Sequence, residues 1–387
     1  MTTAAPPSGR DIAYRGFHLP SDQADSTADG LRTTDRGLTL GSADPTATRG
    51  SWTSPPVRVG FAVAEVVPSW TADTPDGCWI EVELRGWHGD EPSTGWYVLA
   101  RWAADDRAVQ RTSVPGQRDG DARVDTDTLI VTGATVTGWQ ARLTLFRPAG
   151  SPTAPVLRSI GAVATGAVPL GEPALDVDRA AAAGRGRVLD VPRYSQRLHA
   201  GQHPQWGGGG DSWCSPTCTS MVLAYWGAEP TPEHYAWVEP PGPRPVVVHA
   251  ARHCYDHAYD GAGNWPFNTA YAGLHGVDAF VTRLRSLAEA ETFLAAGIPL
   301  IVSAAFRAGE VPGLAYDTGG HLMVLVGFTV DGDPVLNDPY APDDDAVRRT
   351  VPRQRFEAAW QRGSGGVAYV LRPPSVPLPP PPAQANW

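Results

Sequence analysis

Short runs of alternating apolar and polar residues dominate residues 51–165. In residues 142–146, apolar side chains occupy every second position, which is the period of a strand with one buried face. Glycine, proline and aspartate separate the runs. The spacing predicts strands over 57–67, 79–84, 96–102, 128–131, 140–146 and 156–163. Many short strands with such turns are typical of an antiparallel β-sandwich, here expected to be jelly-roll-like.

The segments outside this region show no comparable alternation. Residues 1–50 are polar and rich in Asp, Thr, Gly and Pro, which predicts a loose arm with at most an edge strand around 38–40. Residues 166–187 are rich in Ala, Gly and Pro and have the composition of a linker. The proline-rich residues 373–387 predict an extended or disordered tail.

Residues 188–372 mix helical and strand patterns, which predicts an α+β domain. Gly227 and Gly297 are typical residues just beyond a helix end, and Ser286 with Glu289 has the spacing of a capping box. We expect helices over 215–226, 248–259 and 286–296, and strands over 299–305, 321–330 and 334–337.

Length and composition narrow the class of protein. A chain of 387 residues predicts two or three domains. The net charge is -10, lysine is absent and no polybasic run occurs, so neither nucleic acid nor a membrane is an expected partner. No apolar stretch approaches the ~20 residues of a membrane span, and residues 1–30 show no signal-peptide pattern, which leaves the localisation open.

Cys214 is the candidate nucleophile. It stands between the glycine run 207–210 and an apolar helix whose first turn would contain Pro216. Unpaired N–H groups and the helix dipole at such a position favour the thiolate, which is the reactive form of cysteine. The backbone N–H of Cys214 could also stabilise an oxyanion. The alternative for any single cysteine is a small buried side chain.

The other cysteines predict no metal site and no cofactor. Four cysteines without a Cys-x-x-Cys pair favour free thiols over a disulfide scaffold or a structural zinc site. Cys218 lies one helical turn after Cys214 and is expected to be a packed thiol. His249, His253 and His257 form an i, i+4, i+8 stripe that could bind zinc, but no Glu follows His253 as in metalloproteases, so a packed helix face is favoured.

His321 and Asp338 are the candidate base and its orienting carboxylate. His321 follows two glycines and begins an apolar strand. The Asp331-Gly332 turn predicts a hairpin that pairs Leu325 with Asp338. Asp338 would then share the sheet face of His321, with Asn337 on the opposite face. In this register Asp338 lies two pairs from His321, so a longer loop, a bulge or twist has to bring them together.

Two further features have both a functional and a structural interpretation. Gln196 could donate its amide to an oxyanion, although a surface glutamine is the ordinary alternative. Seven tryptophans fall in residues 51–165. Exposed on a concave face they could stack sugars, which makes a cell-wall glycan a candidate partner; the favoured interpretation is core and interdomain packing.

Residues 191–196, 213–227, 320–327 and 337–339 resemble the family-39-like cysteine peptidases, the papain-fold group typified by bacteriocin-leader-processing domains. The actinobacterial branch shares Tyr255-Asp256, residues 263–268 and residues 318–321. The resemblance covers 188–371, and the upstream sandwich region, with Ser69-Trp70 and residues 125–127, is similar to the N-terminal region of that branch.

The resemblance implies a papain-like domain with Cys214 as nucleophile, His321 as base, Asp338 as orienter and Gln196 as oxyanion donor. Members of the branch are usually exported, and many family members have a small residue where this chain has Cys218.

Three functions follow as hypotheses. The first is a cysteine peptidase that hydrolyses peptide or other amide bonds in a peptide or protein substrate. The second is an acyl-transfer enzyme on the same triad, such as a transglutaminase, ligase or cell-wall amidase. The third is a sugar- or wall-binding protein whose papain-like domain is inactive; an intact triad argues against it.

Overall fold

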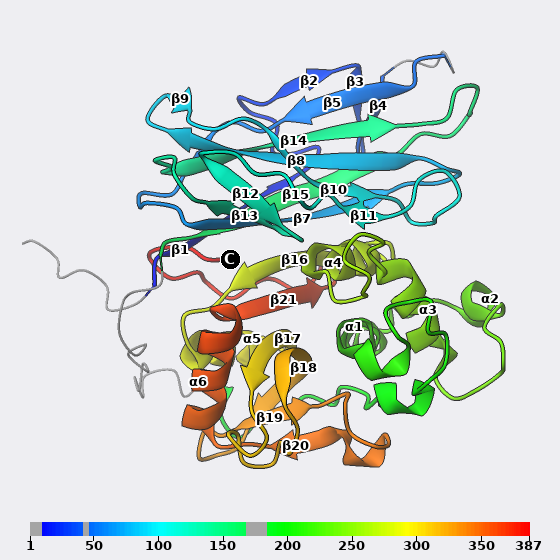
Figure 1. Cartoon of the computed structure of the whole chain (residues 1–387), viewed down its shortest axis with the longest axis vertical. Coiled ribbons are helices and arrows are strands. Elements are labelled where there is room, and N and C mark those ends of the chain that lie inside the picture. Colours follow the sequence, from blue (N-terminus) through cyan, green and yellow to red (C-terminus); the bar gives the residue numbers. More distant parts are fainter. Residues whose placement is uncertain (1–9, 42–45, 168–183) are drawn as a thin grey trace, which may run out of the picture.

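The computed structural model describes residues 10–41, 46–167 and 184–387, and it consists of two stacked halves (Figure 1). The first half is built from two antiparallel sheets, and the second from one antiparallel sheet with helices beside it. Most of the expected linker, residues 168–183, lies outside the described residues. Across the described ranges, no helix has the length and apolar content needed to cross a bilayer.

The two sheets of the first half pack face to face around one core. One sheet has the order β12-β13-β7-β15-β4-β3, with β1 also paired to β15. Its strands are β1 (Ile12–His18), β3 (Leu31–Thr34), β4 (Gly37–Leu40), β7 (Glu65–Asp73), β12 (Ala122–Asp125), β13 (Thr128–Val131) and β15 (Val156–Thr165). The chain therefore forms an antiparallel sandwich in this region.

The second sheet has the order β11-β10-β8-β14-β5-β2, with β6 added on β14 and β9 on β8. Its strands are β2 (Thr27–Asp29), β5 (Arg49–Thr53), β6 (Val57–Arg58), β8 (Trp79–His88), β9 (Glu91–Pro92), β10 (Tyr97–Trp102), β11 (Thr112–Ser113) and β14 (Gly138–Phe146). The long strands β8 and β14 pair along nine residues and form the centre of this sheet.

The described residues 10–41 and 46–53 do not form the expected loose arm: they supply β1 to β5. β1 pairs with β15 over its whole length, from Ile12 opposite Thr165 to His18 opposite Ser159. The apolar residues of these strands, such as Ile12, Phe17 and Trp52, are buried, but they are too sparse in this polar stretch to give a clear period-two pattern. The strand expected over 57–67 is also displaced, since only Val57–Arg58 pairs there and β7 begins at Glu65.

The tryptophans of the sandwich are mainly core residues. Trp52, Trp70, Trp102 and Trp139 are at most 1% exposed, so these four cannot form a sugar platform. The remaining three, Trp79, Trp87 and Trp96, are half-buried. Trp79 stacks on Phe146, and the Arg85 guanidinium lies over both Trp87 and Trp96.

The third sheet, in the second half, has the order β16-β21-β17-β18-β19-β20. Its strands are β16 (Asp278–Arg283), β17 (Leu300–Phe306), β18 (Thr318–Phe328), β19 (Pro334–Asn337), β20 (Arg348–Thr350) and β21 (Val367–Arg372). The α-helices are α1 (Cys214–Tyr225), α2 (Pro232–Tyr235), α3 (Pro245–Cys254), α4 (Trp265–Gly273), α5 (Leu287–Ala295) and α6 (Arg353–Ser364). Short 3-10 helices cover Gln196–His199, Gly210–Ser212 and Asp345–Val347.

Helices α1, α2 and α3 gather on one side of this half, and α6 lies on the other (Figure 1). The α1 helix packs against β18 and α3, and nearly all of its residues up to Leu223 are buried. Small and apolar residues on every face allow this, and Gly227, with a φ of 65°, lies just beyond its end. The structure therefore fixes both ends of the helix that begins with Cys214.

Two helices differ from expectation. The α3 helix begins at Pro245 and ends at Cys254, several residues before the expected end. The α5 helix follows Ser286 as expected, but no capping box forms: the Glu289 carboxylate accepts a hydrogen bond from the Arg285 N–H instead. The Leu287 N–H donates to Glu357, which takes over part of the capping.

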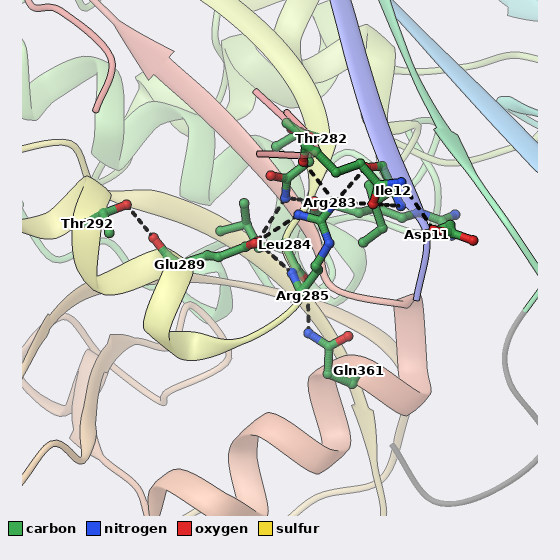
Figure 2. A network of polar contacts seen from close by, with 11 residues as sticks. Asp11, Ile12, Thr282, Arg283, Leu284, Arg285, Glu289, Thr292 and Gln361 are labelled. Atoms are coloured by element: carbon green, nitrogen blue, oxygen red, sulfur yellow. Dashed lines mark hydrogen bonds and ion pairs between the residues drawn. The ribbon is translucent and has the colours of Figure 1, made fainter. Parts of the chain in front are cut away.

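The tail after β21 has no helix or strand, yet its end is tightly packed between the two halves of the molecule. Asn386 is fully buried and donates to the Arg283 carbonyl at 2.8 Å, while Thr282 donates to the Asn386 carbonyl. Figure 2 shows this junction, where Arg285 also donates to the Ile12 carbonyl of β1 at 2.7 Å. The end of the tail is therefore ordered by contacts that no local proline pattern reveals.

Candidate active site

Cys214 is the first residue of α1, and it is half-buried, whereas Cys78, Cys218 and Cys254 are buried. The indole of the preceding residue, Trp213, donates to the Trp206 carbonyl at 2.7 Å and fixes the chain just before the helix. Among the four cysteines, Cys214 thus combines access to solvent with the positive end of a helix dipole.

His321 and Asp338 come together from two neighbouring strands. His321 lies in β18, and Asp338 directly follows β19. The Nε2 atom of His321 and Oδ1 of Asp338 are 2.9 Å apart, which is a hydrogen-bond distance between two buried side chains. The other ring nitrogen, Nδ1, remains for the thiol of Cys214.

The hairpin that joins them has a different register from the expected one. Phe328 pairs with Pro334, the loop is longer than two residues, and a bulge follows between Leu325 and Gly327. Leu325 therefore lies opposite Leu336, and the expected pairing of Leu325 with Asp338 is wrong by two residues. The loop and the bulge move Asp338 toward His321 while keeping it on the same face, because the shift is an even number of residues.

The electrostatics favour an ion pair between Cys214 and His321. Burial opposes the imidazolium, but hydrogen bonds with Asp338 and Cys214 and their charges prevail, and the pKa of His321 rises to about 9. Burial likewise opposes the Cys214 thiolate, but the hydrogen bond and charge of His321 lower the pKa of the thiol below its ordinary value. The two groups titrate as a coupled pair, and the charge of each favours the charged form of the other.

Asp338 is held in its charged form by several groups. Burial would raise its pKa, but His321 foremost, and then the Tyr340 N–H and Arg349, keep it below the ordinary value. The Tyr340 N–H donates to Oδ1 at 3.0 Å, and the Arg349 guanidinium forms an ion pair with Oδ2 at 3.3 Å. These contacts leave the carboxylate little freedom to turn away from the imidazole.

Two tyrosines enclose the imidazole. The ring of Tyr316 meets His321 edge-on at 5.4 Å, and Tyr340 does so at 6.2 Å. The two phenol rings also contact each other at 4.7 Å. Together they exclude water from one side of His321, which strengthens its hydrogen bond with Asp338.

Asn337 points away from the site. Its amide donates to the Pro192 carbonyl at 3.0 Å, and its oxygen accepts from the Arg348 side chain at 3.0 Å. The residue is fully buried and links the irregular segment at Pro192 to Arg348 of β20. Its contacts are those of a structural residue.

Gln196 lies under the loop that leads to Cys214. Its side-chain amide donates to the carbonyls of Gly210 and Asp211, at 2.8 and 2.9 Å, while its own Oε1 is buried without a hydrogen-bond partner. Both amide protons are thus committed to the backbone in this structure. An oxyanion contact from Gln196 would require one of these two bonds to open.

The remaining candidates lie apart from the triad chemistry. The Cys218 thiol donates to the Leu322 carbonyl at 3.3 Å, and burial raises its pKa well above the ordinary value. On α3, His253 Nδ1 bonds the His249 carbonyl and His249 Nδ1 bonds the Tyr271 hydroxyl. No group of three or more His, Cys, Asp or Glu residues within the described ranges is arranged to hold a metal ion.

Residue patterns along the chain did not indicate Tyr316, Tyr340 or Arg349 as neighbours of the site. Of these three residues, Tyr340 could most easily have been predicted, because it lies two residues after Asp338, within the span of a turn. Tyr316 and Arg349 approach from other segments, and nothing local to either residue indicates that contact.

Comparisons with known proteins agree with this layout. Residues 13–165 match the family model described as the Peptidase C39 N-terminal domain, and residues 188–367 match the model of the Peptidase_C39 like family. The expected resemblance to the C39-like group with this N-terminal region is thereby confirmed. No curated protein matches the chain.

The solved structures that resemble the chain do so weakly. A family two carbohydrate esterase from Cellvibrio japonicus is 13% identical over 46% of this chain and 43% of that chain, with a TM-score of 0.19. The serine protease of Aeromonas sobria is 10% identical over 43% and 28%, with a TM-score of 0.20. Each match spans less than half of the other protein, and such likenesses carry no information about activity.

Proposed function

We propose that the chain is a cysteine peptidase that hydrolyses peptide or other amide bonds in a peptide or protein substrate. The observation that supports this most is the His321–Asp338 hydrogen bond of 2.9 Å beside the half-buried Cys214 at the start of α1. Such a set, with a thiol, a base and an orienting carboxylate, is the arrangement that nucleophilic catalysis requires. The papain-like α+β fold of residues 188–372 is part of this proposal.

The proposed reaction has two halves. The Cys214 thiolate attacks the amide carbon, and the tetrahedral intermediate collapses to a thioester as the C–N bond breaks. The imidazolium of His321 gives its proton to the leaving amine. Neutral His321 then takes a proton from water, whose oxygen attacks the thioester; collapse releases the carboxylic acid and restores the thiolate.

The oxyanion needs donors near Cys214. The backbone N–H of Cys214, at the start of the helix, is one candidate. Gln196 is the second, provided that its amide releases the carbonyl of Gly210 or Asp211 when substrate binds. Until then, Gln196 holds the glycine loop in place.

Acyl transfer is the competing outcome of the same first half-reaction, with an amine in place of water. The burial of four sandwich tryptophans disfavours the third alternative, a sugar-binding protein with an inactive domain, since these rings cannot meet a glycan.

An amide-substrate library, assayed with and without added amines, tests the proposal. The wild type should release free carboxylic acids, and Cys214→Ala should release none. Cys218→Ala is the matched control, because it removes a buried thiol from the same helix and should leave turnover in place. Products that carry the added amine would instead favour acyl transfer, and full turnover by Cys214→Ala would refute the assignment.

A further inference from the structure

The segment between α3 and α4, residues 255–264, is organised around one buried carboxylate. Asp256 Oδ1 accepts from the N–H groups of Ala258 and Tyr259, at 3.1 and 3.3 Å, and Oδ2 accepts from the Asn264 side chain at 2.9 Å. Asp256 is fully buried. We call residues 255–264 the bridging segment, because its two ends and its tip contact different parts of the molecule.

The sandwich holds the first end of the bridging segment. Arg111 precedes β11, and its side chain is fully buried. It donates to the carbonyls of Tyr255 at 3.2 Å and Arg252 at 2.8 Å, as well as to Ala103 in its own domain at 2.7 Å. The Ser113 N–H also reaches across and donates to Asp256 Oδ1 at 2.9 Å.

The sandwich also holds the other end of the segment. Asp127, buried between β12 and β13, accepts a hydrogen bond from the N–H of Trp265, the first residue of α4, at 3.0 Å. Two residues later, Phe267 enters the sandwich core and meets Trp70 edge-on at 6.1 Å. Both ends of the bridging segment are thus fixed by side chains of the sandwich domain.

The tip of the segment reaches the loop that carries the nucleophile. Gly207 begins the glycine run before Cys214 and has a φ of 67°. A Cβ at this position would lie 3.0 Å from Gly261 Cα and 3.2 Å from the Asp260 carbonyl oxygen, so only glycine allows this approach. The tip of the bridging segment therefore packs closely against the loop that precedes Cys214.

Tyr259 stands at this tip and is 51% exposed. Its ring lies over the backbone of Gly261, and the negative charge of Cys214 helps, after burial, to raise the pKa of its hydroxyl. Among the described residues, only Val188, Tyr259 and Val330 are large apolar side chains with such exposure. An exposed aromatic ring beside the loop that leads to the nucleophile is well suited to contact a substrate side chain.

We propose that the N-terminal sandwich is a positioning domain for the catalytic site: Arg111 fixes the bridging segment so that Tyr259 contacts the substrate beside Cys214. This inference rests on the proposed peptidase function. Arg111 is a positioning residue, since it touches neither the thiol nor the imidazole, and Tyr259 is the substrate-contacting residue. The sandwich would thereby act on substrate binding without taking part in bond cleavage.

Steady-state kinetics on the full chain tests the inference, with the best amide substrate from the library. Arg111→Met should raise KM at least tenfold and change kcat less than threefold. Arg142→Met is the matched control: it removes a sandwich arginine whose ion pair with Glu83 lies within the second sheet, and should leave KM unchanged. The alkylation rate of Cys214 by iodoacetamide should change less than twofold in both variants.

Two further variants keep the test decisive if Arg111→Met does not fold. Tyr259→Ala, a surface change, should raise KM to a similar extent, and Tyr259→Phe should restore it. Arg111→Lys keeps the charge but cannot span three carbonyls, so an intermediate KM is expected. In the Tyr259→Ala background, Arg111→Lys should add less than twofold.

A wild-type KM in Tyr259→Ala, or in a folded Arg111→Met, would overturn the inference. Fully multiplicative effects of the two changes would do the same, because Arg111 would then not act through Tyr259. Failure of the proposed function has a different signature: Cys214 in the wild type would then neither alkylate selectively nor support any amide hydrolysis.

Discussion

Replacement of Asp338 by alanine should reduce kcat strongly while the fold persists. The carboxylate accepts the 2.9 Å hydrogen bond from His321, and its charge contributes to the raised pKa of the imidazole. Without it, buried His321 would prefer the neutral form, because burial alone lowers its pKa. The thiolate of Cys214 would then lose its imidazolium partner near pH 7.

The magnitude follows from that single bond. A hydrogen bond to a charged group contributes ~1.5–3 kcal/mol. At 1.36 kcal/mol per tenfold in rate, Asp338→Ala should lower kcat roughly 10- to 150-fold. Asp338→Asn retains an oxygen that can accept from His321 but loses the charge, so a loss of roughly 5- to 10-fold is expected. Stability should change by less than ~2 kcal/mol, since Arg349 is partly exposed and can hydrate.

The assay is kcat and KM on an amide substrate, together with thermal unfolding of each variant. Asn337→Ala is the control, because Asn337 bonds Pro192 and Arg348 rather than His321. It should lower the melting temperature and leave kcat nearly unchanged in the folded protein. A catalytically dead but folded Asn337→Ala, with normal turnover by Asp338→Ala, would refute the assigned triad.

Three further predictions concern the pH dependence of activity, the contact between the two domains at Asp127, and the C-terminal tail. The kcat/KM profile should be bell-shaped, with an alkaline limb near pH 9 where His321 loses its proton; a profile that keeps rising beyond pH 10 would contradict the ion pair. Burial raises the pKa of Asp127 to about 6, so the folded state loses stability as pH rises from about 4 to 6. The free energy of unfolding of Asp127→Asn should therefore exceed that of the wild type by up to about 3 kcal/mol at pH 7.5, and by nothing below pH 4. An equal gain in stability at both pH values would refute the assignment. Asn386→Ala removes a buried amide that bonds the Arg283 carbonyl and should lower the melting temperature without altering Cys214 alkylation; an unchanged melting temperature would argue against an ordered tail.

Local patterns were sufficient for the elements that carry the candidate site. The glycine run, Pro216 and Gly227 delimit α1 almost to the residue, and alternation along β18 and β19 separates Asp338 from Asn337 by face. The register itself was wrong by two residues, because neither the longer loop nor the bulge leaves a mark in an apolar strand such as residues 322–328.

The features that could not be predicted from the sequence depend on contacts between segments that are distant in the chain. Strands β1, β4 and β5 form against β15 and β14, which lie far along the chain. The side-chain amide of Gln196 is oriented by the carbonyls of Gly210 and Asp211. The residues next to Gln196 in the sequence give no sign of these contacts. From the sequence, Arg111 would likewise be predicted to lie on the surface. Its burial becomes evident only from its contact with the bridging segment, which is distant in the chain.

The most direct test of the central claim is the pH dependence of alkylation at each cysteine, mapped by mass spectrometry after brief treatment with iodoacetamide. The thiolate–imidazolium pair predicts that Cys214 is modified first, and that its rate stays high below pH 7, where ordinary thiols are protonated. Cys78, Cys218 and Cys254, whose pKa values are raised by burial, should remain unmodified until the protein unfolds. Faster labelling of any of these three, or a Cys214 rate that rises only near pH 9, would contradict the account.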